Sequence, residues 1–400
     1  MRASLYIHVP FCAGKCDYCD FYSVPLGPGD RRINMYVERL LADGELLFAE
    51  FGPGQIPCVY IGGGTPSVLG AAGIKRLLGG LSALMSGAEE GPREFTVEAN
   101  PESADKAFLE ACLGGGVNRL SLGLQTFHEP SRRAVHRTGD GRLLPERLAL
   151  ASELFGENFS ADLMAGLPFQ DEKILSEDME KLLAFRPGHV SLYSLTVEPG
   201  TPLAAAARSR GVSPAVLLPG ADEADRLWIA GRDFLEKAGY GQYEVSSFSL
   251  PGKRSAHNIR YWRMENWLGL GPAASGTIID DGSGRGRRYT VNPGLDAWID
   301  RPADAPPPLG EETLEPETLM KESLLMGFRY TGGPDPALFE RRFAVTVEDA
   351  IPQTLARWRG RGLAEKGRTA LNREGLLLLN SFLLESFGEL ESPSARRGKT

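Results

Sequence analysis

Six short runs rich in β-branched and aromatic residues divide the first half of the chain. Each run is followed by a Gly or Pro turn and then by a helical pattern, as at residues 33–51 and 104–113. Alternating strand and helix units of this kind predict a parallel sheet, because each helix returns the chain to the edge where the next strand begins. The six runs begin near Leu5, Val59, Phe95, Leu120, Phe159 and Val190.

The strands of this predicted sheet are apolar enough, as in YIGGG and HVSLYSL, to be covered on both faces, which favours a barrel or a doubly wound sheet. Polar motifs follow the strands directly, and in a barrel that edge carries the active site. These motifs are the clustered cysteines, GGGTP at 62–66, EANPE at 98–102, LQTF at 124–127 and DLMAGLP at 162–168.

The later part of the chain changes in character after about Gly239, where glycine and aromatic residues replace the helical pattern. Met320, Leu324 and Phe328 then mark one face of a helix in a second, smaller domain. We therefore predict an α/β barrel at 1–240, associated strands and loops at 241–300, a Pro-rich acidic linker at 301–317, a mostly helical, winged-helix-like domain at 318–387 and a disordered tail at 388–400.

Composition restricts the class of protein. The 400 residues carry 44 Lys and Arg against 52 Asp and Glu, a net charge of −8, which argues against a surface built throughout for nucleic acid. The strongest apolar run, at 376–384, is interrupted by Asn380 and Ser381, so we expect no membrane span. The N-terminal run leads into cysteines rather than a signal cleavage site, and we expect a cytoplasmic protein.

Three of the five cysteines lie close together, with the spacing C-x3-C-x2-C at Cys12, Cys16 and Cys19. Three thiolates can bind three irons of a [4Fe–4S] cluster and leave the fourth iron open, whereas a structural zinc ion takes four ligands. A zinc site with His8 and free thiols are the alternatives. Cys58 and Cys112 stand apart in a strand-like and a helical stretch, and we expect both in the core.

This cysteine triad, followed by an aromatic-rich stretch, resembles the signature of the radical S-adenosylmethionine (SAM) superfamily. The resemblance implies a partial (β/α)6 TIM-like barrel that binds a [4Fe–4S] cluster and SAM, with electron transfer from the cluster cleaving the sulfonium. It also implies SAM contacts from the glycine-rich strand end and from polar residues at the other strand ends. Those positions are Tyr6, Tyr18, Gly63, Gly64, Thr65, Glu98, Gln125, Arg137, Asp162 and Thr196, with Arg132 expected on the surface as a contrast.

Over residues 4–380 the motifs resemble more narrowly the coproporphyrinogen III oxidase-like branch of that superfamily. The anaerobic oxidase of porphyrin biosynthesis carries an N-terminal extension and a fourth cysteine two residues after the triad. This chain has Phe21 at that position and begins eleven residues before Cys12. The heme chaperone subfamily, HemW, has Phe there and a later H-N-x-x-Y-W motif, which is intact here at 257–262.

The H-N-x-x-Y-W motif offers His257 as an axial ligand for heme iron, with Tyr261 and Trp262 as walls for the macrocycle. Asn258 could orient the imidazole through a hydrogen bond, and Arg260 could pair with a heme propionate. The alternative for His257 is an ordinary hydrogen-bonded loop histidine, and Arg260 is equally well explained as a surface residue.

The sequence thus predicts a heme chaperone-like protein with cluster, SAM and heme as cofactors. Its partners would be an unidentified heme-acceptor protein and a reductant such as flavodoxin or ferredoxin, with peripheral membrane contact left open. The resemblance leaves enzymatic activity undecided, and oxidase activity is the first alternative. Eight basic against three acidic residues at 341–373 raise a second, an RNA-modifying enzyme, but we expect these charges to be solvated and no nucleic acid to bind.

Overall fold

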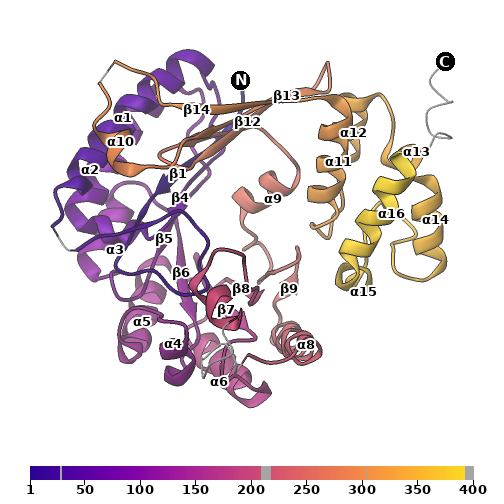
Figure 1. Cartoon of the computed structure of the whole chain (residues 1–400), viewed down its shortest axis with the longest axis horizontal. Coiled ribbons are helices and arrows are strands. Elements are labelled where there is room, and N and C mark those ends of the chain that lie inside the picture. Colours follow the sequence, from indigo (N-terminus) through magenta and orange to yellow (C-terminus); the bar gives the residue numbers. More distant parts are fainter. Residues whose placement is uncertain (28, 209–217, 303, 392–400) are drawn as a thin grey trace.

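Parallel strands form the centre of the molecule (Figure 1). The computed structural model describes residues 1–27, 29–208, 218–302 and 304–391. All six predicted strands are present, and neighbouring strands pair in parallel in chain order, so the predicted partial barrel is confirmed. They are β1 (Ser4–Val9), β4 (Cys58–Gly63), β5 (Glu94–Ala99), β6 (Arg119–Gln125), β7 (Phe159–Ala165) and β8 (His189–Ser194).

Helices between the strands cover the outer face of the sheet (Figure 1). Aspartates begin two of them, since Asp105 accepts from the amide of Phe108 and Asp171 from that of Ile174, which satisfies amides that lack helical partners. The main helices are α1 (Arg32–Phe51), α2 (Gly70–Leu84), α3 (Lys106–Gly114), α5 (Leu144–Phe155), α6 (Glu172–Leu183) and α8 (Ala221–Lys237). Shorter elements are β2 (Phe11–Cys12), β3 (Val24–Pro25), η1 (Pro66–Leu69), η2 (Met85–Gly87), α4 (Glu129–Ala134), η3 (Gly141–Leu143) and α7 (Pro202–Arg208).

The inner face of the sheet is polar, although the strands were predicted to be apolar enough for cover on both faces. Along β5, Phe95 and Val97 pack into the core beneath the helices, whereas Thr96 and Glu98 line the barrel interior. Side chains alternate between the two faces of a strand, so this pattern separates an apolar outer layer from a polar lumen. The same alternation runs through β6, β7 and β8.

Further strands extend the sheet to twelve strands and make it mixed, since β11 pairs with β1 in parallel and the pairs beyond it, like those beyond β8, are antiparallel. Beside β1 lie β11 (Trp267–Leu270), β12 (Ser275–Asp280), β13 (Arg285–Val291) and β14 (Leu309–Leu314), and beside β8 lie β10 (Ser247–Ser249) and β9 (Gly241–Gln242). Helices α9 (Ala256–Trp262) and α10 (Leu295–Ile299) interrupt this series. The predicted linker at 301–317 is therefore not a free connection, because it contains β14, which pairs with β13 along six residues.

The C-terminal region is helical, as predicted, and stands to one side of the barrel with its own apolar core (Figure 1). One antiparallel bridge, Ala364 to Leu371, lies between its helices. The helices are α11 (Pro316–Gly327), α12 (Pro336–Phe343), α13 (Val347–Ala350), α14 (Pro352–Gly360), α15 (Arg373–Leu377) and α16 (Leu379–Glu391). The tail predicted at 388–400 is thus helical as far as Glu391, and 392–400 lie outside the described residues.

One stretch of the described residues, Pro66–Gly87, is long and apolar enough to cross a membrane by length and composition alone. This differs from the expectation that no run approaches that length. The stretch contains α2, whose Ile74, Leu77 and Leu81 are fully buried in the barrel core. We therefore interpret α2 as a core helix of the barrel. The cytoplasmic location stays a prediction.

Candidate functional site

A cavity of about 360 Å³ opens at the C-terminal ends of the parallel strands. The loop after β1 carries the three cysteines into it, with Cys16 buried and Cys12 and Cys19 half-buried. Thr65, from the loop after β4, lies with its hydroxyl 3.4 Å from the Cys12 sulfur. Two successive strand ends therefore meet at the cysteines, as the barrel prediction requires.

The glycine-rich loop after β4 packs against the cysteine loop through its backbone. Gly64 and Thr65 donate to the carbonyls of Val9 and Phe11, at 2.8 and 2.6 Å. A Cβ at Gly64 would lie 2.6 Å from the Phe11 oxygen, and Gly63 has a φ of 108° beneath the His8 ring. A side chain at either position would collide with the strand and loop of the cysteines, so glycine allows the two loops to pack closely at the edge of the cavity.

Arg137 joins the cysteine loop to the ends of β5 and β6. Its Nη1 lies 3.7 Å from the Cys16 sulfur, while Nη2 donates to Asn100 Oδ1 at 2.8 Å and to the Gly123 carbonyl. Its Nε is buried without a hydrogen-bond partner. A guanidinium held in this way has donors available for a carboxylate in the cavity.

Arg132 is buried, which corrects the expectation of a surface residue. Only 2% of it is exposed, and its guanidinium donates to the carbonyls of Leu124, Thr126 and Thr138. It holds the turn after β6 in place. Arg133, whose side chain is 77% exposed and paired with Glu129, is the surface neighbour.

Two carboxylates form the floor of the cavity. Glu98 accepts from the Tyr60 hydroxyl at 2.5 Å and from the Gly63 amide at 3.2 Å. Burial raises the pKa of Glu98 to about 7 and that of Asp162 to about 6, because each loses hydration of its charged form. Both groups therefore titrate close to neutral pH, which is typical of functional carboxylates.

The donor set fits an iron–sulfur cluster. In the described part of the chain, no three His, Cys, Asp or Glu side chains are grouped so as to hold a single metal ion. A cubane cluster places each thiolate on a different iron, so its ligands stand farther apart than those of one zinc ion. His8 is taken up elsewhere, since its ring nitrogens contact the Tyr6 hydroxyl and the Tyr22 carbonyl, both at 3.0 Å. The cysteine loop, with the glycine-rich loop packed beside it at one cavity, suits a cluster with a ligand beside it.

Most residues proposed from the sequence line this one cavity. Those that do are Cys12, Cys16, Cys19, Tyr18, Gly63, Gly64, Thr65, Glu98, Gln125, Arg137, Asp162 and Thr196. Gln125 has a φ of 70° at a register shift between β6 and β7, an irregularity that redirects a strand-end side chain. Asn100, which joins Arg137 to the Thr65 hydroxyl, was not singled out, although it stands within the EANPE motif.

Tyr6 and His257 lie outside the lining of that cavity. The Tyr6 ring faces Tyr60 inside the barrel, and burial raises the pKa of its hydroxyl. His257, half-buried in α9, also stacks on the Tyr60 ring, with the two ring centroids 4.6 Å apart. Its Nδ1 is buried without a hydrogen-bond partner, and burial lowers the pKa of the imidazole to about 4. His257 is thus a neutral histidine with an unused nitrogen, close to but not within the cysteine site.

The neighbours of His257 differ from their predicted roles. No hydrogen bond joins the Asn258 side chain to the imidazole in the described residues; instead Glu94 accepts from the His257 amide at 2.8 Å and fixes the start of α9. Arg260 donates to the Ser4 hydroxyl and pairs with Glu265 at 2.5 Å, so it is not a free surface cation. Tyr261 is 41% exposed and packs edge-on against Trp267.

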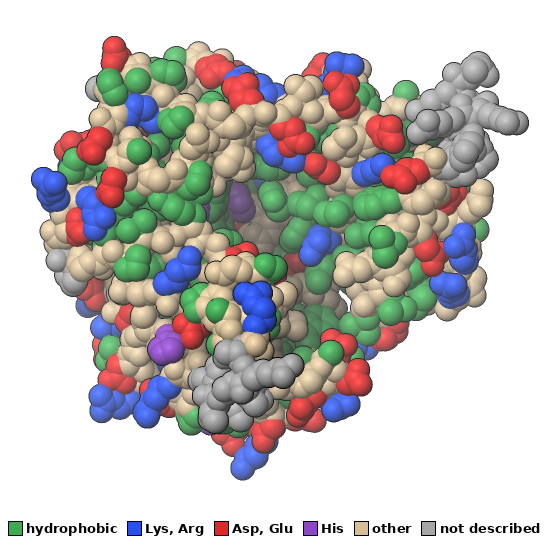
Figure 2. All heavy atoms as spheres, viewed as in Figure 1, with side chains coloured by type: hydrophobic (Ala, Val, Ile, Leu, Met, Phe, Trp, Pro, Cys, Tyr) green, Lys and Arg blue, Asp and Glu red, His purple; other side chains and the backbone are tan. Residues whose placement is uncertain are grey.

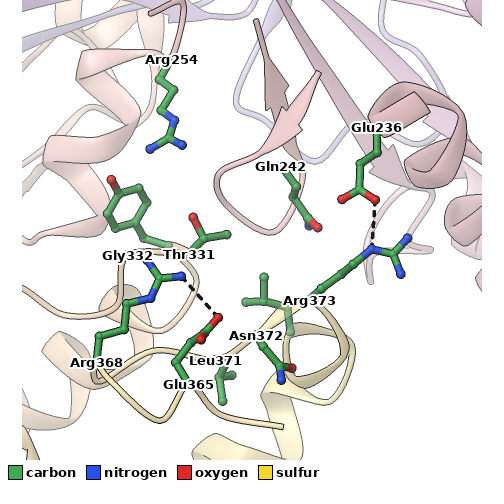
Figure 3. Close-up of a pocket in the computed structure, with 12 residues that line it drawn as sticks. Glu236, Gln242, Arg254, Thr331, Gly332, Glu365, Arg368, Leu371, Asn372 and Arg373 are labelled. Carbon is green, nitrogen blue, oxygen red and sulfur yellow. Dashed lines mark hydrogen bonds and ion pairs between the residues drawn. The ribbon is translucent and has the colours of Figure 1, made fainter. Parts of the chain in front are cut away.

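A second cavity, of about 340 Å³, lies between the barrel and the C-terminal helices (Figure 3). Its lining is mostly polar, and ion pairs cross it or border it, including Arg373 to Glu236 at 3.0 Å and Arg368 to Glu365 at 3.4 Å. Figure 2 shows that the face between barrel and C-terminal helices is hollowed, with apolar side chains along the helical side. The polar lining of the second cavity does not suit an apolar macrocycle.

The basic residues of the C-terminal region are largely neutralised. Seven of the eight positions between 341 and 373 pair with carboxylates, among them Arg357 and Arg361 with Glu385 and Arg359 with Glu348. A nucleic-acid surface needs cations free to neutralise phosphates. The basic residues of this stretch are therefore largely engaged within the chain, and the absence of nucleic-acid binding stays a prediction.

The chain is similar to known proteins over most of its length. The family model of the radical SAM superfamily matches residues 6–182. The heme chaperone HemW of Lactococcus lactis subsp. lactis (strain IL1403) is 34% identical over 345 residues, covering 86% of each chain. HemW of Bacillus subtilis (strain 168) is 30% identical over 393 residues, which is 97% of this chain and 100% of that one.

A solved structure extends the comparison to the fold. Coproporphyrinogen III oxidase (HemN) from Escherichia coli superposes with a TM-score of 0.78 at 21% identity, covering 96% of this chain and 90% of that chain. This similarity concerns the architecture alone. From the superfamily match and from relatives that align over nearly the whole chain, the protein belongs to the HemW family of radical SAM proteins.

Proposed function

We propose that the protein binds a [4Fe–4S] cluster through Cys12, Cys16 and Cys19, with SAM beside it. The observation that carries this proposal is the convergence of the cysteine loop, the glycine-rich loop and Arg137 on one cavity. A reduced cluster supplies the electron for reductive cleavage of SAM. The chain's own part is to bind and orient: Gly63 and Gly64 offer backbone, and Arg137 offers donors to a carboxylate.

The carboxylates Glu98 and Asp162 would complete the SAM site. Acceptors of this kind suit an ammonium group or ribose hydroxyls, and their place on the floor of the cavity lets them receive either. Tyr18, Gln125 and Thr196 would form the remaining wall, while Tyr6 would act from below by packing against Tyr60.

We propose further that the protein holds heme and passes it to an acceptor protein, because relatives of similar length are named heme chaperones. His257 is the candidate axial ligand, since its neutral imidazole has an unused ring nitrogen. The exposed ring of Phe21, at the rim of the cysteine cavity, stands where the oxidases of this branch carry a fourth cysteine. A flavodoxin or ferredoxin would supply electrons, and the heme acceptor is not identified by any feature of the chain.

Anaerobic purification followed by iron and sulfide analysis and electron paramagnetic resonance tests the cluster. We expect about four irons per chain and a spectrum that changes when SAM is added, both lost in Cys16→Ser. One equivalent of zinc in place of iron would overturn the assignment.

Oxidase activity is decided by a separate assay. The reduced protein is incubated with SAM and coproporphyrinogen III, and protoporphyrinogen formation is followed. We expect none, while hemin should bind at one equivalent with a shifted Soret band. Robust protoporphyrinogen formation would replace the chaperone proposal with the oxidase. Absence of hemin binding would return both the oxidase and the RNA-modifying enzyme to consideration.

A further inference from the structure

Beneath the cysteine cavity, the inner face of the sheet encloses a smaller polar chamber of about 90 Å³. The two share Glu98, Ser121, Asp162 and Tyr193, which form the roof of the chamber and the floor of the cavity above. Closed barrels usually fill this volume with branched apolar side chains. Here the chamber is lined instead by hydroxyl, imidazole, guanidinium and carboxyl groups.

The floor of the chamber comes from the beginnings of the strands. Arg119 and His189 are the first residues of β6 and β8, and Thr96 pairs with Arg119 across β5 and β6. These three residues are only 7%, 2% and 1% exposed. Each has a buried polar atom with no hydrogen-bond partner: Arg119 Nη2, His189 Nδ1 and Thr96 Oγ1. Buried polar atoms are normally paired with protein groups, ordered water or a ligand, so three around one chamber indicate that something small and polar fills it.

The hydrogen-bond chain behind His189 sets its tautomer. The Tyr243 hydroxyl accepts from the Ser255 amide at 3.4 Å and is also hydrogen-bonded to the Ser247 side chain, and we assign its hydrogen to His189 Nε2, 2.8 Å away. Burial and the nearby Arg119 charge lower the pKa of His189 well below its usual value, so the ring is neutral. A neutral ring that accepts at Nε2 carries its hydrogen on Nδ1. His189 therefore presents a donor to the chamber.

Arg119 brings a positive charge that no carboxylate contacts directly among the described residues. Nη1 donates to the Lys253 carbonyl at 3.2 Å, Nη2 has no hydrogen-bond partner, and the charge acts on Asp162 only across the chamber, where it lowers the pKa of that carboxyl against the larger effect of burial. The roof carboxylates are engaged elsewhere, Glu98 with Tyr60 and Gly63, and Asp162 with Ser191. A buried cation without a partner is costly, and an anion at Nη2 would remove that cost.

We propose that this chamber binds a small anion, either a halide or a small planar oxyanion such as formate or bicarbonate, held by Arg119 Nη2, His189 Nδ1 and Thr96 Oγ1. The volume admits an ion of this size together with water and excludes SAM and porphyrin. The site is distinct from the cluster, SAM and heme sites proposed above, and it uses none of their residues as donors. Its effect would be to neutralise Arg119 below the SAM-binding floor.

Crystals of the full chain soaked in sodium bromide provide the direct test. We expect an anomalous bromine peak within hydrogen-bond distance of Arg119 Nη2 in the wild type and no peak in Thr96→Val or Arg119→Gln. A parallel soak in sodium formate shows which class of anion binds. Planar density at the same position, with no bromine peak in the bromide soak, identifies an oxyanion site. Water alone in both soaks, or a bromine peak that persists in both variants, would overturn the proposal.

A solution measurement complements the crystals and covers variants that do not crystallise. Thermal unfolding is compared in sodium chloride, sodium formate and sodium gluconate at equal ionic strength, gluconate being too large for the chamber. A ligand that binds only the folded state raises the unfolding midpoint as its concentration rises.

We expect chloride or formate to raise the midpoint above its value in gluconate, both in the wild type and in the surface control Arg133→Gln. In Thr96→Val, the anion concentration needed for the same rise should be at least tenfold higher. If Arg119→Gln does not fold, Thr96→Val, which keeps the side-chain volume, carries the test. Equal midpoints in the three salts for the wild type would contradict an anion site, whatever the state of the cluster or heme sites.

Discussion

The imidazole of His257 lies stacked on the ring of Tyr60, with centroids 4.6 Å apart and an angle of 25° between the planes. Tyr60 in turn donates its hydroxyl to Glu98, on the floor of the cysteine cavity. The H-N-x-x-Y-W motif is thus linked by a single side chain to the proposed SAM site. This places the candidate heme ligand against the barrel interior rather than on a free loop.

If His257 is the heme ligand, His257→Ala should alter the Soret band of the hemin complex and weaken hemin retention. A metal ligand must be deprotonated, and the pKa of His257 is lowered to about 4 by burial. Hemin affinity should therefore be constant from pH 8 to about 5 and should fall about tenfold per pH unit only below about 4. Titrations of hemin at several pH values measure this.

His128→Ala is the matched control, because His128 lies outside α9 and its Nδ1 is hydrogen-bonded to the Ser131 hydroxyl. It should leave the hemin spectrum unchanged. A midpoint near 6.5 in the wild-type pH profile would show that another histidine binds the iron, since that value belongs to an unburied imidazole.

Arg137→Gln should weaken SAM binding by roughly thirtyfold, equivalent to about 2 kcal/mol for a lost charge-assisted hydrogen bond. Arg133→Gln, four positions away along the same segment, removes an exposed guanidinium and should change the affinity less than twofold. Isothermal titration of the reconstituted protein with SAM compares the two. Similar losses in both variants would remove Arg137 from the site.

Glu98 should make the cluster-free protein less stable as pH rises. Its pKa is about 7 in the folded protein against 4.5 for an ordinary glutamate, so between these values the folded state holds the extra proton. Stability then falls with rising pH, by on the order of 2 kcal/mol across pH 4.5 to 7, and the loss is complete above the folded pKa. Asp162 contributes with the same sign between 3.8 and about 6.

Urea unfolding at pH 4.5, 5.5 and 7 measures this dependence. Glu98→Gln cannot ionise and should flatten the profile, whereas Glu38→Gln at an exposed ion pair with Arg76 should preserve it. A wild-type profile that rises over this range would contradict the assigned direction.

The parallel order of the barrel could be predicted from sequence because it depends on local patterns. Each strand run precedes its own helix, and the polar motifs mark the strand ends, so the site residues follow once the strands are ordered. Long-range pairing was not accessible in this way. On β14, Glu312 stands opposite Arg288 of β13, and Glu311, opposite Tyr289, forms an ion pair with Arg287. From composition alone, the same acidic residues were predicted to belong to a linker.

Two further differences between prediction and structure have local causes. In R-L-S-L-G-L of β6, polar or small residues alternate strictly with leucine, which is the mark of a strand with one polar face. Arg132 was predicted to lie on the surface because charged side chains are usually exposed, yet both Nη atoms of its guanidinium donate to backbone carbonyls in the turn. Such carbonyl partners are visible only once the turn is folded.

The C-terminal helices should unfold separately from the barrel when their core is damaged. Trp358 is 1% exposed and packs edge-on against Phe382, with its indole nitrogen 3.1 Å from Glu385. This cluster is distinct from the barrel core. The two regions meet outside both cores, through partly exposed ion pairs such as Arg373 with Glu236, through the buried Arg342 with Asp281, and through a small apolar cluster that includes Leu319. Trp358→Ala should cost about 3–5 kcal/mol within the C-terminal region alone.

Calorimetry of Trp358→Ala should accordingly resolve two transitions, with the earlier one assigned to the C-terminal helices. Iron content should match the wild type, because every cysteine of the site and its packing belong to the barrel. Leu384→Ala, at a position 74% exposed on α16, should shift neither transition appreciably. A single transition at lower temperature, accompanied by loss of iron, would show instead that barrel and C-terminal helices fold as one unit and that cluster binding depends on both.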